Sequence, residues 1–459
     1  MALFIKRTRI EAPAAEVFRW HARPGALERL APPWTTIEVV ERSGGIENGS
    51  RVVMRMPLGP SHVRWVAEHR DYVEGEQFRD VQVEGPFARW EHTHRFEADG
   101  AAACYLEDRV EYELPFGVLG ALFGGAPIRK TLERTFAYRH RLTAGDLASH
   151  AAYSGGPLRV LVSGSTGLVG SALVPFLTTG GHRVTRLVRT PPRAGEDAVR
   201  WDPAAGRLDA AALAGADAVV HLAGENIAGG RWTESIKARI KESRRQGTRL
   251  LAQALADLQT PPRVLVAASA IGFYGDRGAE ILREESAPGS GFLADVCREW
   301  EAATTPAAAR GIRVVNLRIG VVLTAAGGAL AKLLPPFRLG AGGRVGSGEQ
   351  YMSWIGLDDL VAVVLHAIRT EALHGPVNAT APQPVTNREF TATLGRVLHR
   401  PTILPLPAAA ARVVLGEMAD EMLLASTRVA PTRLTETSYR FRQPELEGAL
   451  RHTLGKVDS

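Results

Sequence analysis

The hydrophobic and polar positions of the chain follow two patterns, which meet between residues 147 and 158. Before this point, strand-like runs are separated by turn residues, as in a sheet built from short connected strands. After it, short apolar runs without polar alternation are followed by helix-like segments, which is typical of parallel strands covered by helices on both faces. The segment between them, residues 148–157, is small, polar and rich in glycine, and it predicts a hinge. The sequence therefore predicts two units with separate cores.

The first unit, residues 1–147, is expected to combine one sheet with a closing helix. A strand opens the chain, and two short helices follow it, near residues 13–20 and 26–30. In the closing helix, Ile128, Leu132 and Phe136 recur at every fourth position and form an apolar stripe. The predicted strands span residues 3–10, 36–42, 50–56, 62–72, 77–83, 88–97 and 103–114, and the closing helix spans residues 127–147.

Several sequence pieces of this unit are typical of one family. They are Ile10-Glu-Ala-Pro13 with Val17-Phe18, Trp90-Glu-His92 with Phe96, and Glu107-Asp108 before Tyr112. With these pieces in this order, the unit resembles helix-grip proteins of the START-like, polyketide cyclase and lipid-transport type. The resemblance implies an α+β helix-grip domain whose sheet and helix enclose an apolar cavity for a hydrophobic ligand. A core filled by side chains, without a ligand, is the alternative.

Histidines and cysteines give no further site in the sequence. His92 and His94 share one face of a predicted strand at period two. Isolated strand histidines are most often surface residues, so we assign them no role. Cys104 and Cys297 fall in different predicted units and offer neither a disulfide framework nor a metal-ligand cluster. We therefore expect no metal site.

The second unit begins with a strand, a glycine turn, a helix and a second strand. Residues 160–162 are all apolar, and glycines recur at every third position in the turn that follows. The first glycine allows a tight bend, the second lets the backbone approach a pyrophosphate, and the third lets the helix pack against the strand. The pattern predicts a dinucleotide-binding turn, whose contact residues are Gly164, Ser165, Thr166, Gly167, Leu168, Val169 and Gly170.

The next buried strand, residues 218–224, ends beside the predicted cofactor. Its last positions, Leu222, Ala223 and Gly224, are expected to contact the cofactor. Glu225 and Asn226 follow directly and are candidate substrate contacts.

Arginines favour NADP over NAD at this site. The second strand of an NAD enzyme typically ends with an acidic residue that binds the ribose hydroxyls. Here Arg186 and Arg189 stand in that region, and a guanidinium can hold the 2′-phosphate of NADP by two hydrogen bonds. An ordinary surface role for Arg189 is the alternative.

Composition excludes several classes of function. The 459 residues exceed one ordinary domain, and 45% hydrophobic with 23% charged residues are typical of a globular protein with an ample core. The net charge of +6 is small and the basic residues are scattered, so nucleic acid is not an expected partner. No apolar run reaches the ~20 residues that span a bilayer, and the first residues lack the apolar core of a signal peptide. We expect a cytoplasmic protein without stable membrane insertion.

Pieces of the second unit also indicate a family. They include His221-Leu-Ala-Gly-Glu-Asn-Ile227, Ser269-Ala-Ile-Gly-Phe-Tyr-Gly-Asp276, Trp354-Ile with Asp358-Asp359, and Gly375-Pro-Val-Asn378. With the glycine spacing, they resemble the atypical short-chain dehydrogenases of the bacterial "epimerase family" over residues 158–455. The resemblance implies an α/β fold with a doubly wound parallel sheet, a Rossmann domain at 158–400, and a C-terminal extension of the DUF1731 type at 401–459.

One departure from this family of enzymes concerns catalysis. They use a Tyr and a Lys four residues apart on one helix, where the Lys lowers the Tyr pKa. The matching pair here is Leu293 and Cys297 or, in the other register, Phe292 and Val296, and neither pair can transfer a proton. Cys297 lies on the apolar face of the predicted helix and is interpreted as a packing residue.

The remaining catalytic candidates lie at the end of the predicted strand 263–269 and just after it. Ser269 is the one member of the usual catalytic set that is kept, and Tyr274 lies where strand ends form the reaction crevice of this fold. The sequence favours an NADP(H)-dependent oxidoreductase or epimerase that acts on a small molecule. A non-catalytic NADP(H)-binding sensor or scaffold is the alternative, and neither the substrate nor the oligomeric state follows from the sequence.

Overall fold

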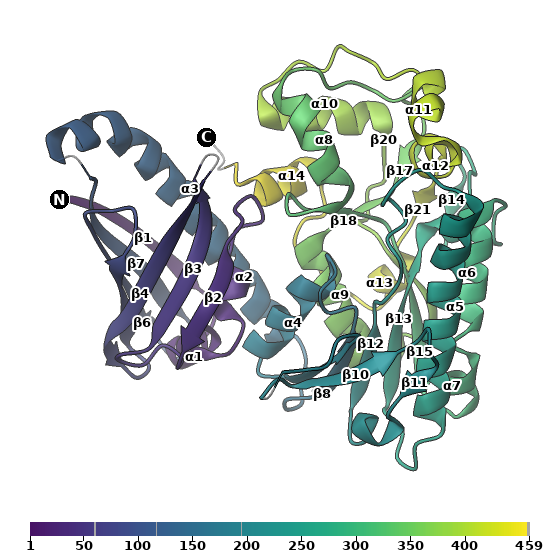
Figure 1. The fold of residues 1–459 in the computed structure, drawn as a ribbon, viewed down its shortest axis with the longest axis horizontal. Coiled ribbons are helices and arrows are strands. Elements are labelled where there is room, and N and C mark those ends of the chain that lie inside the picture. Colours follow the sequence, from purple (N-terminus) through teal and green to yellow (C-terminus); the bar gives the residue numbers. More distant parts are fainter. Residues whose placement is uncertain (59–60, 116, 194, 457–459) are drawn as a thin grey trace. The chain divides into compact units, whose positions relative to one another are not determined.

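The computed structural model describes residues 1–58, 61–115, 117–193 and 195–456. It contains two compact units, one formed mainly by Met1–Gly155 and the other mainly by Gly156–Leu177 and His182–Arg451 (Figure 1). Within the described residues, no helix combines the length and the apolar character that crossing a membrane requires.

The first unit contains one antiparallel sheet with the strand order β1-β7-β6-β5-β4-β3-β2. The predicted strands are present, and their ends lie within two residues of the predicted ones. Two short helices, α1 (Ala14–Ala22) and α2 (Ala26–Leu30), connect the first two strands. The strands are β1 (Ala2–Ile10), β2 (Glu38–Ser43), β3 (Arg51–Leu58), β4 (Ser61–Val73), β5 (Gln77–Glu84), β6 (Arg89–Ala98) and β7 (Cys104–Glu113).

The long helix α3 (Gly117–Ala151) differs from its prediction at both ends. The sequence predicts a start at about Pro127, but the helix runs through this residue, although proline usually disrupts helix interiors. At its other end the helix includes residues 148–151, so the hinge expected from residue 148 is shorter than predicted. The predicted apolar stripe is confirmed by Leu132 and Phe136, which are buried, and the Phe136 ring lies 5.4 Å from that of Phe4 on β1.

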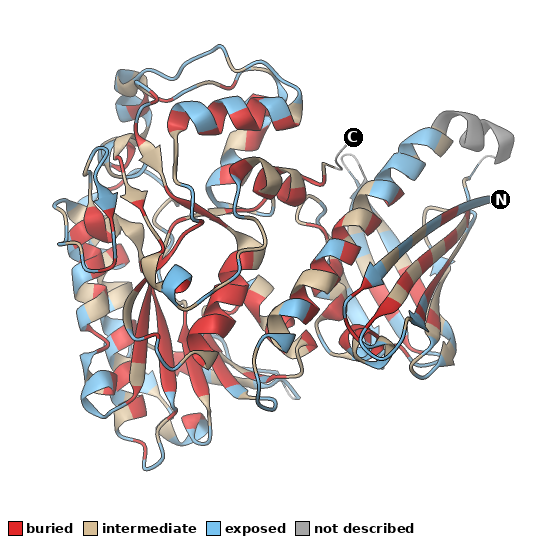
Figure 2. Ribbon diagram, turned by 180° about the vertical axis from the view of Figure 1, so that it is seen from behind, coloured by how far each residue is buried: buried red, intermediate tan, exposed pale blue. Residues whose placement is uncertain are grey.

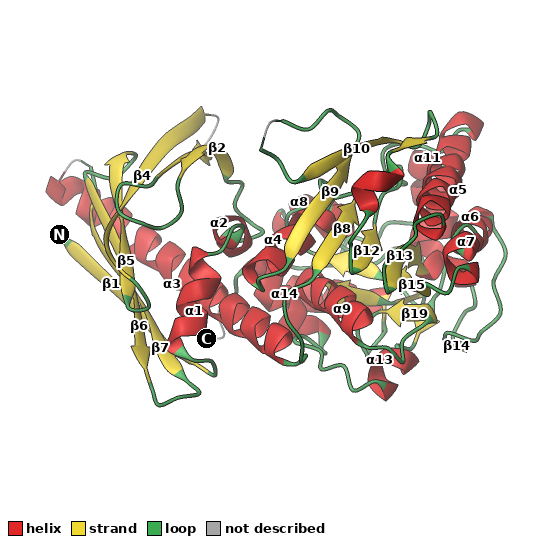
Figure 3. Ribbon diagram, turned by 90° about the horizontal axis from the view of Figure 1, so that it is seen from below, coloured by secondary structure: helices red, strands yellow, loops and turns green. Residues whose placement is uncertain are grey.

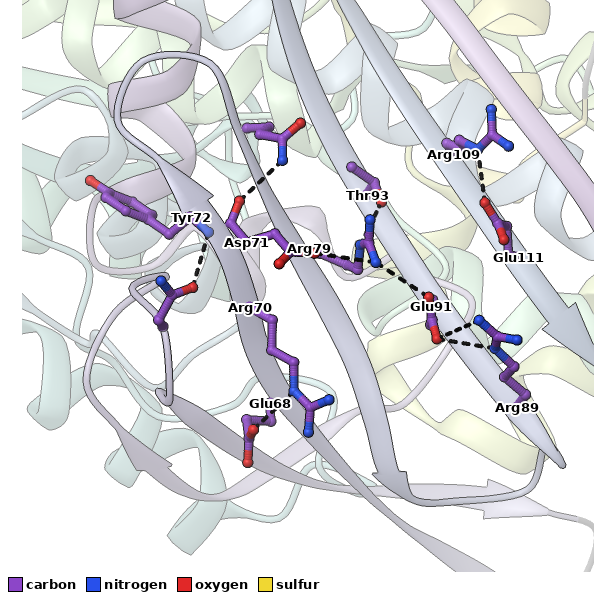
Figure 4. Close-up of polar contacts among 12 residues, drawn as sticks. Glu68, Arg70, Asp71, Tyr72, Arg79, Arg89, Glu91, Thr93, Arg109 and Glu111 are labelled. Atoms are coloured by element: carbon purple, nitrogen blue, oxygen red, sulfur yellow. Dashed lines mark hydrogen bonds and ion pairs between the residues drawn. The ribbon is translucent and has the colours of Figure 1, made fainter.

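The two faces of the antiparallel sheet differ in chemistry. On the inner face, Phe18 of α1 packs with Phe78 and Phe96 in the largest apolar cluster of this unit. On the outer face, charged side chains form pairs across neighbouring strands (Figure 4). Arg79, for example, lies 3.2 Å from Asp71 and 3.4 Å from Glu91. The sheet is therefore buried on one side and solvated on the other, as antiparallel sheets commonly are.

The second unit is built on a sheet with the order β11-β10-β9-β8-β12-β13-β15-β19. Its strands are parallel except β11, and those at its centre are buried (Figure 2). The chain moves outward from β8 in one direction and then from β12 in the other, so the sheet is doubly wound as predicted, with its switch point between these two strands. The strands are β8 (Arg159–Ser163), β9 (Arg183–Val188), β10 (Ala198–Asp202), β11 (Arg207–Leu208), β12 (Ala218–His221), β13 (Val264–Ala270), β15 (Arg313–Ile319) and β19 (Gly375–Ala379).

Helices cover both faces of this sheet (Figure 3). The single helix predicted over residues 292–310 is wrong, because the structure divides it after Ala302 and a new helix begins at Thr305, with Pro306 in its first turn. The helices are α4 (Gly170–Thr179), α5 (Glu234–Ala256), α6 (Phe292–Ala302), α7 (Thr305–Ala309), α8 (Gly328–Arg338), α9 (Leu357–Arg369) and α10 (Asn387–Leu398).

The C-terminal extension is joined to the second unit by backbone pairing. Its strand β21 (Arg428–Val429) pairs in parallel with β14 (Ile281–Leu282), which precedes α6 in the chain. The helices of the extension are α11 (Ala408–Leu415), α12 (Glu417–Ala419), α13 (Thr432–Glu436) and α14 (Leu446–Leu454).

Candidate functional site

The glycine turn between β8 and α4 leaves no room for a side chain at two of its positions. Gly164 has a φ of +70°, and a Cβ atom there would lie 2.7 Å from the carbonyl carbon of Leu222. A Cβ atom at Gly170 would lie 2.2 Å from the carbonyl oxygen of Gly164. Gly167 closes the turn, since its N–H donates to that same oxygen over 3.0 Å. The backbone geometry therefore requires glycine at both ends of the turn.

The other predicted cofactor contacts of this turn lie before the amino end of α4. Ser165 is buried, and its Oγ has no hydrogen-bond partner among the described residues. Thr166 is exposed, whereas Leu168 and Val169 are half-buried. Because a helix dipole favours negative charge at its amino end, this position is suited to a phosphate group.

The end of β12 lies against the glycine turn. The N–H of Leu222 donates to the carbonyl oxygen of the last residue of β8 over 3.2 Å. A Cβ atom at Gly164 would also lie 2.8 Å from the nitrogen of Ala223. Gly224 is covered by the guanidinium of Arg244, which would lie 3.2 Å from a Cβ atom at that glycine. The structure thus brings the segment Leu222–Gly224 to the turn, next to the predicted phosphate position.

The two candidate substrate residues lie on the loop after β12. The carboxylate of Glu225 pairs with Arg239 over 3.3 Å. Asn226 is exposed, and its Oδ1 accepts a hydrogen bond from the N–H two residues further on, at 2.9 Å. Both residues therefore lie on the same loop beyond the end of β12.

The two arginines of the second strand differ in position. Arg186 lies within β9, and its guanidinium is 3.5 Å from the carboxylate of Glu196. Arg189 is exposed directly after the strand. Arg189 is therefore the arginine at the carboxyl end of β9, where this fold places the cofactor ribose.

A buried polar network lies near the carboxyl ends of β13, β15 and β19. Ser269 Oγ donates to Glu301 Oε1 over 2.7 Å. Arg318 holds both carboxylate oxygens of Glu301, at 2.8 and 2.9 Å, and also donates to the phenol oxygen of Tyr274 at 2.9 Å. The structure therefore brings the two catalytic candidates into one network, in which Glu301 and Arg318 stand between them.

Tyr274 is held by structural contacts on all sides. Its side chain is fully buried, and its hydroxyl lies 2.7 Å from Asn378 Oδ1 and 2.9 Å from the carbonyl oxygen of Arg283. Burial raises the pKa of Tyr274 to about 12, despite the nearby Arg318 guanidinium. The catalytic roles of Ser269 and Tyr274 stay predictions, and these contacts favour a structural part for both side chains.

Three members of the network were not predicted from the sequence. Arg318 had a signal, because it is a charged residue between the apolar Leu317 and Ile319 at the end of β15. The periodicity of a single sequence does not distinguish Glu301 from a surface glutamate on the same helix. Glu284 lies outside any periodic element, and its Oε1 accepts from the N–H groups of Asn378 (3.1 Å) and Arg433 (3.2 Å).

The helix positions that usually carry the Tyr–Lys pair are apolar in the structure as well. A Cβ atom at Gly272, in the turn after β13, would lie 3.1 Å from Leu293 Cβ and 3.9 Å from Cys297 Sγ. Cys297 is buried, and burial raises its thiol pKa to about 12, which confirms the packing interpretation.

Glu421 of the C-terminal extension accepts hydrogen bonds from the N–H groups of Phe292 (3.0 Å) and Leu293 (3.1 Å), at the start of this helix.

In the first unit, the expected surface position of the strand histidines is wrong for His92 and His94. Their exposed fractions are 4% and 6%, and His92 Nε2 lies 2.8 Å from the buried Asp108. Burial lowers the pKa of His94, but the carboxylates of Asp108 and Asp80 outweigh it and raise this pKa to about 9. The prediction failed because β6 carries polar residues on both faces, so hydrophobic alternation does not mark its inner side.

A doubly wound parallel sheet with a glycine turn at its switch point defines a dinucleotide-binding protein of the short-chain dehydrogenase type. The chain belongs to the epimerase family, and the model of the NAD dependent epimerase/dehydratase family matches residues 160–379. Two further models match, Polyketide cyclase / dehydrase and lipid transport over residues 10–136 and the domain of unknown function DUF1731 over residues 406–453. Both resemblances noted in the sequence are therefore confirmed.

Relatives of known sequence match a little less than two thirds of the chain. An epimerase family protein of Mycobacterium tuberculosis is 45% identical over 291 residues, which are 63% of this chain and 96% of that protein. The human epimerase family protein SDR39U1 is 39% identical over 297 residues, which are 64% of this chain and 99% of that protein.

Solved structures include a similar protein of nearly the same length. A crystal structure described as a nucleoside-diphosphate sugar epimerase from Corynebacterium glutamicum has a TM-score of 0.81 and 36% identity, covering 98% of this chain and 90% of its own. The structure of human SDR39U1 (isoform 2) with NADPH has a TM-score of 0.59 and 36% identity, covering 65% of this chain and all of its own.

Tyr274 is expected to ionise only near pH 12, because burial favours the neutral phenol. A free tyrosine ionises near pH ~10, so above that pH the unfolded chain loses a proton that the folded chain keeps, and stability falls as pH rises. The alkaline difference titration between the wild type and Tyr274→Phe, followed in the phenolate absorption band, isolates this one group. Circular dichroism recorded alongside shows whether the fold persists, and a midpoint near neutral pH would instead identify Tyr274 as an acid–base group.

Proposed function

We propose that the second unit binds NADP(H) at the glycine turn and acts on a small molecule as an oxidoreductase or epimerase. The observation that carries this proposal is the close backbone approach at Gly164 and Gly170, which permits only glycine and directs the amino end of α4 at the turn. The NADPH in the crystal structure of the human relative supports the same cofactor here. The exposed Arg189 at the end of β9 is placed to hold the 2′-phosphate.

The residues proposed to meet the substrate lie on loops at the carboxyl ends of β12 and β13. Glu225 and Asn226 would contact the substrate, and Ser269 would orient a carbonyl or hydroxyl group. A bound nicotinamide supplies hydride transfer, so the chain itself must supply binding, orientation and a proton. In this proposal Tyr274 supplies the proton. Because Tyr274 is buried, access of the substrate to its hydroxyl is the most demanding requirement of the mechanism.

The alternative is an NADP(H)-binding sensor or scaffold without catalysis. It is favoured by one specific observation, the apolar pair Leu293 and Cys297 on the helix that carries Tyr and Lys in active enzymes of this class. The raised pKa of the Tyr274 hydroxyl, about 12, also favours this alternative.

A cytoplasmic location of the protein also stays a prediction.

Turnover separates the two functions. If the unit is an enzyme, stopped-flow measurements will show NADPH oxidation with a member of a carbonyl library. Tyr274→Phe and Ser269→Ala should then slow it by ~100-fold or more, the usual contribution of a positioned proton donor. Tyr105→Phe, which changes a tyrosine of the other unit, is the matched control. Undiminished turnover in both variants excludes the two residues, and NADPH binding without any turnover supports the sensor.

Loss of the Arg189 guanidinium should weaken NADPH binding selectively. A charge-assisted hydrogen bond to a phosphate contributes about 1.5–3 kcal/mol, so Arg189→Ala is expected to raise the Kd for NADPH roughly 10- to 100-fold and to leave that for NADH nearly unchanged. Calorimetric titration with both cofactors measures this difference. Arg249→Ala, at an exposed position on α5, is the control, and equal wild-type affinities for NADPH and NADH would contradict the assignment.

We also propose that the first unit is a helix-grip domain that binds a hydrophobic ligand. Support comes from an aromatic group on the inner side of its sheet, in which the Trp90 ring lies 5.2 Å from Trp65, 4.7 Å from Phe87 and 6.2 Å from Tyr112. Trp65, Phe87 and Trp90 are only half-buried, so a ligand that covers them would gain apolar contact area.

Removing the central ring of this group should reduce uptake of an apolar probe. Titration of the full chain with a fluorescent fatty acid is expected to saturate at one probe per chain, and Trp90→Ala should weaken binding roughly 10-fold, since a buried aromatic side chain contributes a few kcal/mol at most. Val83→Ala, exposed on β5, is the control. A wild-type chain that takes up no probe would leave only the filled-core interpretation.

A further inference from the structure

The inner side of the antiparallel sheet carries a group of charged and polar side chains that the proposed functions do not use. Three strands contribute to it, and in the register of the sheet Asp80 lies opposite His92, and His94 lies opposite Asp108. Residues directly opposite each other in a sheet point to the same face, so all four side chains meet on the inner side. The exposed fractions of His92, His94 and Asp108 side chains are 4%, 7% and 4%, while Asp80 keeps 26%. The group is therefore buried except at Asp80.

Each of the two imidazoles faces a carboxylate with both of its nitrogens. His92 Nε2 is 2.8 Å and His94 Nδ1 is 2.7 Å from the same oxygen of Asp108. The other nitrogens, His92 Nδ1 and His94 Nε2, lie 3.6 and 3.3 Å from Asp80 Oδ2. The His92 contact to Asp108 is a hydrogen bond, whereas His94 Nδ1 lies close to the same oxygen without forming an aligned hydrogen bond. On the Asp80 side, one nitrogen of each ring and a carboxylate oxygen of Asp80 therefore lie close to one another.

The separations on the Asp80 side suit a shared ion. Zinc binds nitrogen and oxygen ligands at ~2.0–2.2 Å, so two ligands of a tetrahedral ion are ~3.3–3.6 Å apart. The distances from Asp80 Oδ2 to the two histidine nitrogens fall in that range, and the three potential ligand atoms all lie within 4.8 Å of one another. Two histidines and one carboxylate leave further coordination positions open, as in catalytic rather than structural metal sites.

The surrounding contacts are those that support metal ligands in proteins. A ligating histidine typically donates its second ring N–H to a carboxylate, which fixes its tautomer and orientation. Asp108 does this for His92, and the same oxygen lies 2.7 Å from His94 Nδ1. Asp108 is itself held by His140, whose Nε2 lies 2.5 Å from its second oxygen. The second oxygen of Asp80 lies 2.9 Å from His69 Nε2.

From this arrangement we propose that Asp80, His92 and His94 bind one divalent transition-metal ion of the Zn²⁺ class inside the first unit, with Asp108 as the positioning residue. The expectation of no metal site, which rested on the cysteines, is replaced by this proposal. The site does not depend on NADP(H) binding, because every residue that forms it belongs to the first unit.

Metal uptake by the full-length protein tests the proposal. After treatment with a chelator, the wild type is expected to bind one Zn²⁺ per chain in calorimetric titration and elemental analysis. Co²⁺ should give visible absorption bands whose intensity indicates a coordination number of four or five. Asp80→Asn, His92→Gln and His94→Gln should each weaken Zn²⁺ binding at least 100-fold. His62→Gln, which changes an exposed histidine of β4, should leave it unchanged.

Asp108→Asn separates the ligands from the residue that orients them. This variant keeps a hydrogen-bond acceptor for one ring and is expected to weaken Zn²⁺ binding by ~10- to 100-fold while the Co²⁺ spectrum keeps its shape. Asp80 is partly exposed, so Asp80→Asn is the variant that tests the site if the buried histidine variants fail to fold. A stripped wild type that binds no Zn²⁺, or an Asp80→Asn variant that binds it as tightly as the wild type, would overturn the proposal.

Discussion

The guanidinium of Arg318 connects more of the second unit than any other interaction described above. It projects from β15 and pairs with Glu301 of α6, while its plane lies 3.4 Å from the centre of the Phe273 ring in the turn after β13. It also donates to Tyr274 and to the carbonyl oxygen of Glu284. A charge with so little exposure is stable only when it is paired and fully hydrogen-bonded. One side chain, that of Arg318, thus holds together the segments that surround the predicted crevice. A lysine could not replace it, because an ammonium group lacks the planar, forked geometry of a guanidinium.

The backbone architecture could be predicted well from the sequence, because it depends on local patterns. Buried runs such as residues 160–162 and 218–224 predicted the parallel strands, and the glycines of the turn indicated its switch point. The failures have local reasons too. Pro127 was predicted to begin a helix, whereas it lies inside α3. The residues on both sides of the break after Ala302 have helical composition, and only Pro306 indicates that a new helix follows.

The chemistry of both units was harder to predict, because it depends on contacts between distant segments. Ser269 and Tyr274 are five residues apart, yet they meet through Glu301 and Arg318 rather than directly. In the first unit, His92 and His94 look like surface residues until the register of β5, β6 and β7 places two carboxylates against them. A single sequence records which residues alternate along a strand, but it does not record which residue lies opposite on the neighbouring strand.

The contacts of the C-terminal extension affect the order in which the protein can reach its final form during synthesis. The sheet of the first unit and α3 are available once residue 151 has left the ribosome, since domains synthesised first generally fold first. In the second unit, α6 lacks the carboxylate that caps its amino end, and β14 lacks its partner strand, until Glu421 and then β21 have emerged. While residues 303–429 are being made, the helix beside the crevice therefore has unsatisfied N–H groups and β14 has an open edge. The nascent dinucleotide fold would be most exposed to misfolding during this interval, after the sheet of the first unit and α3 have been made.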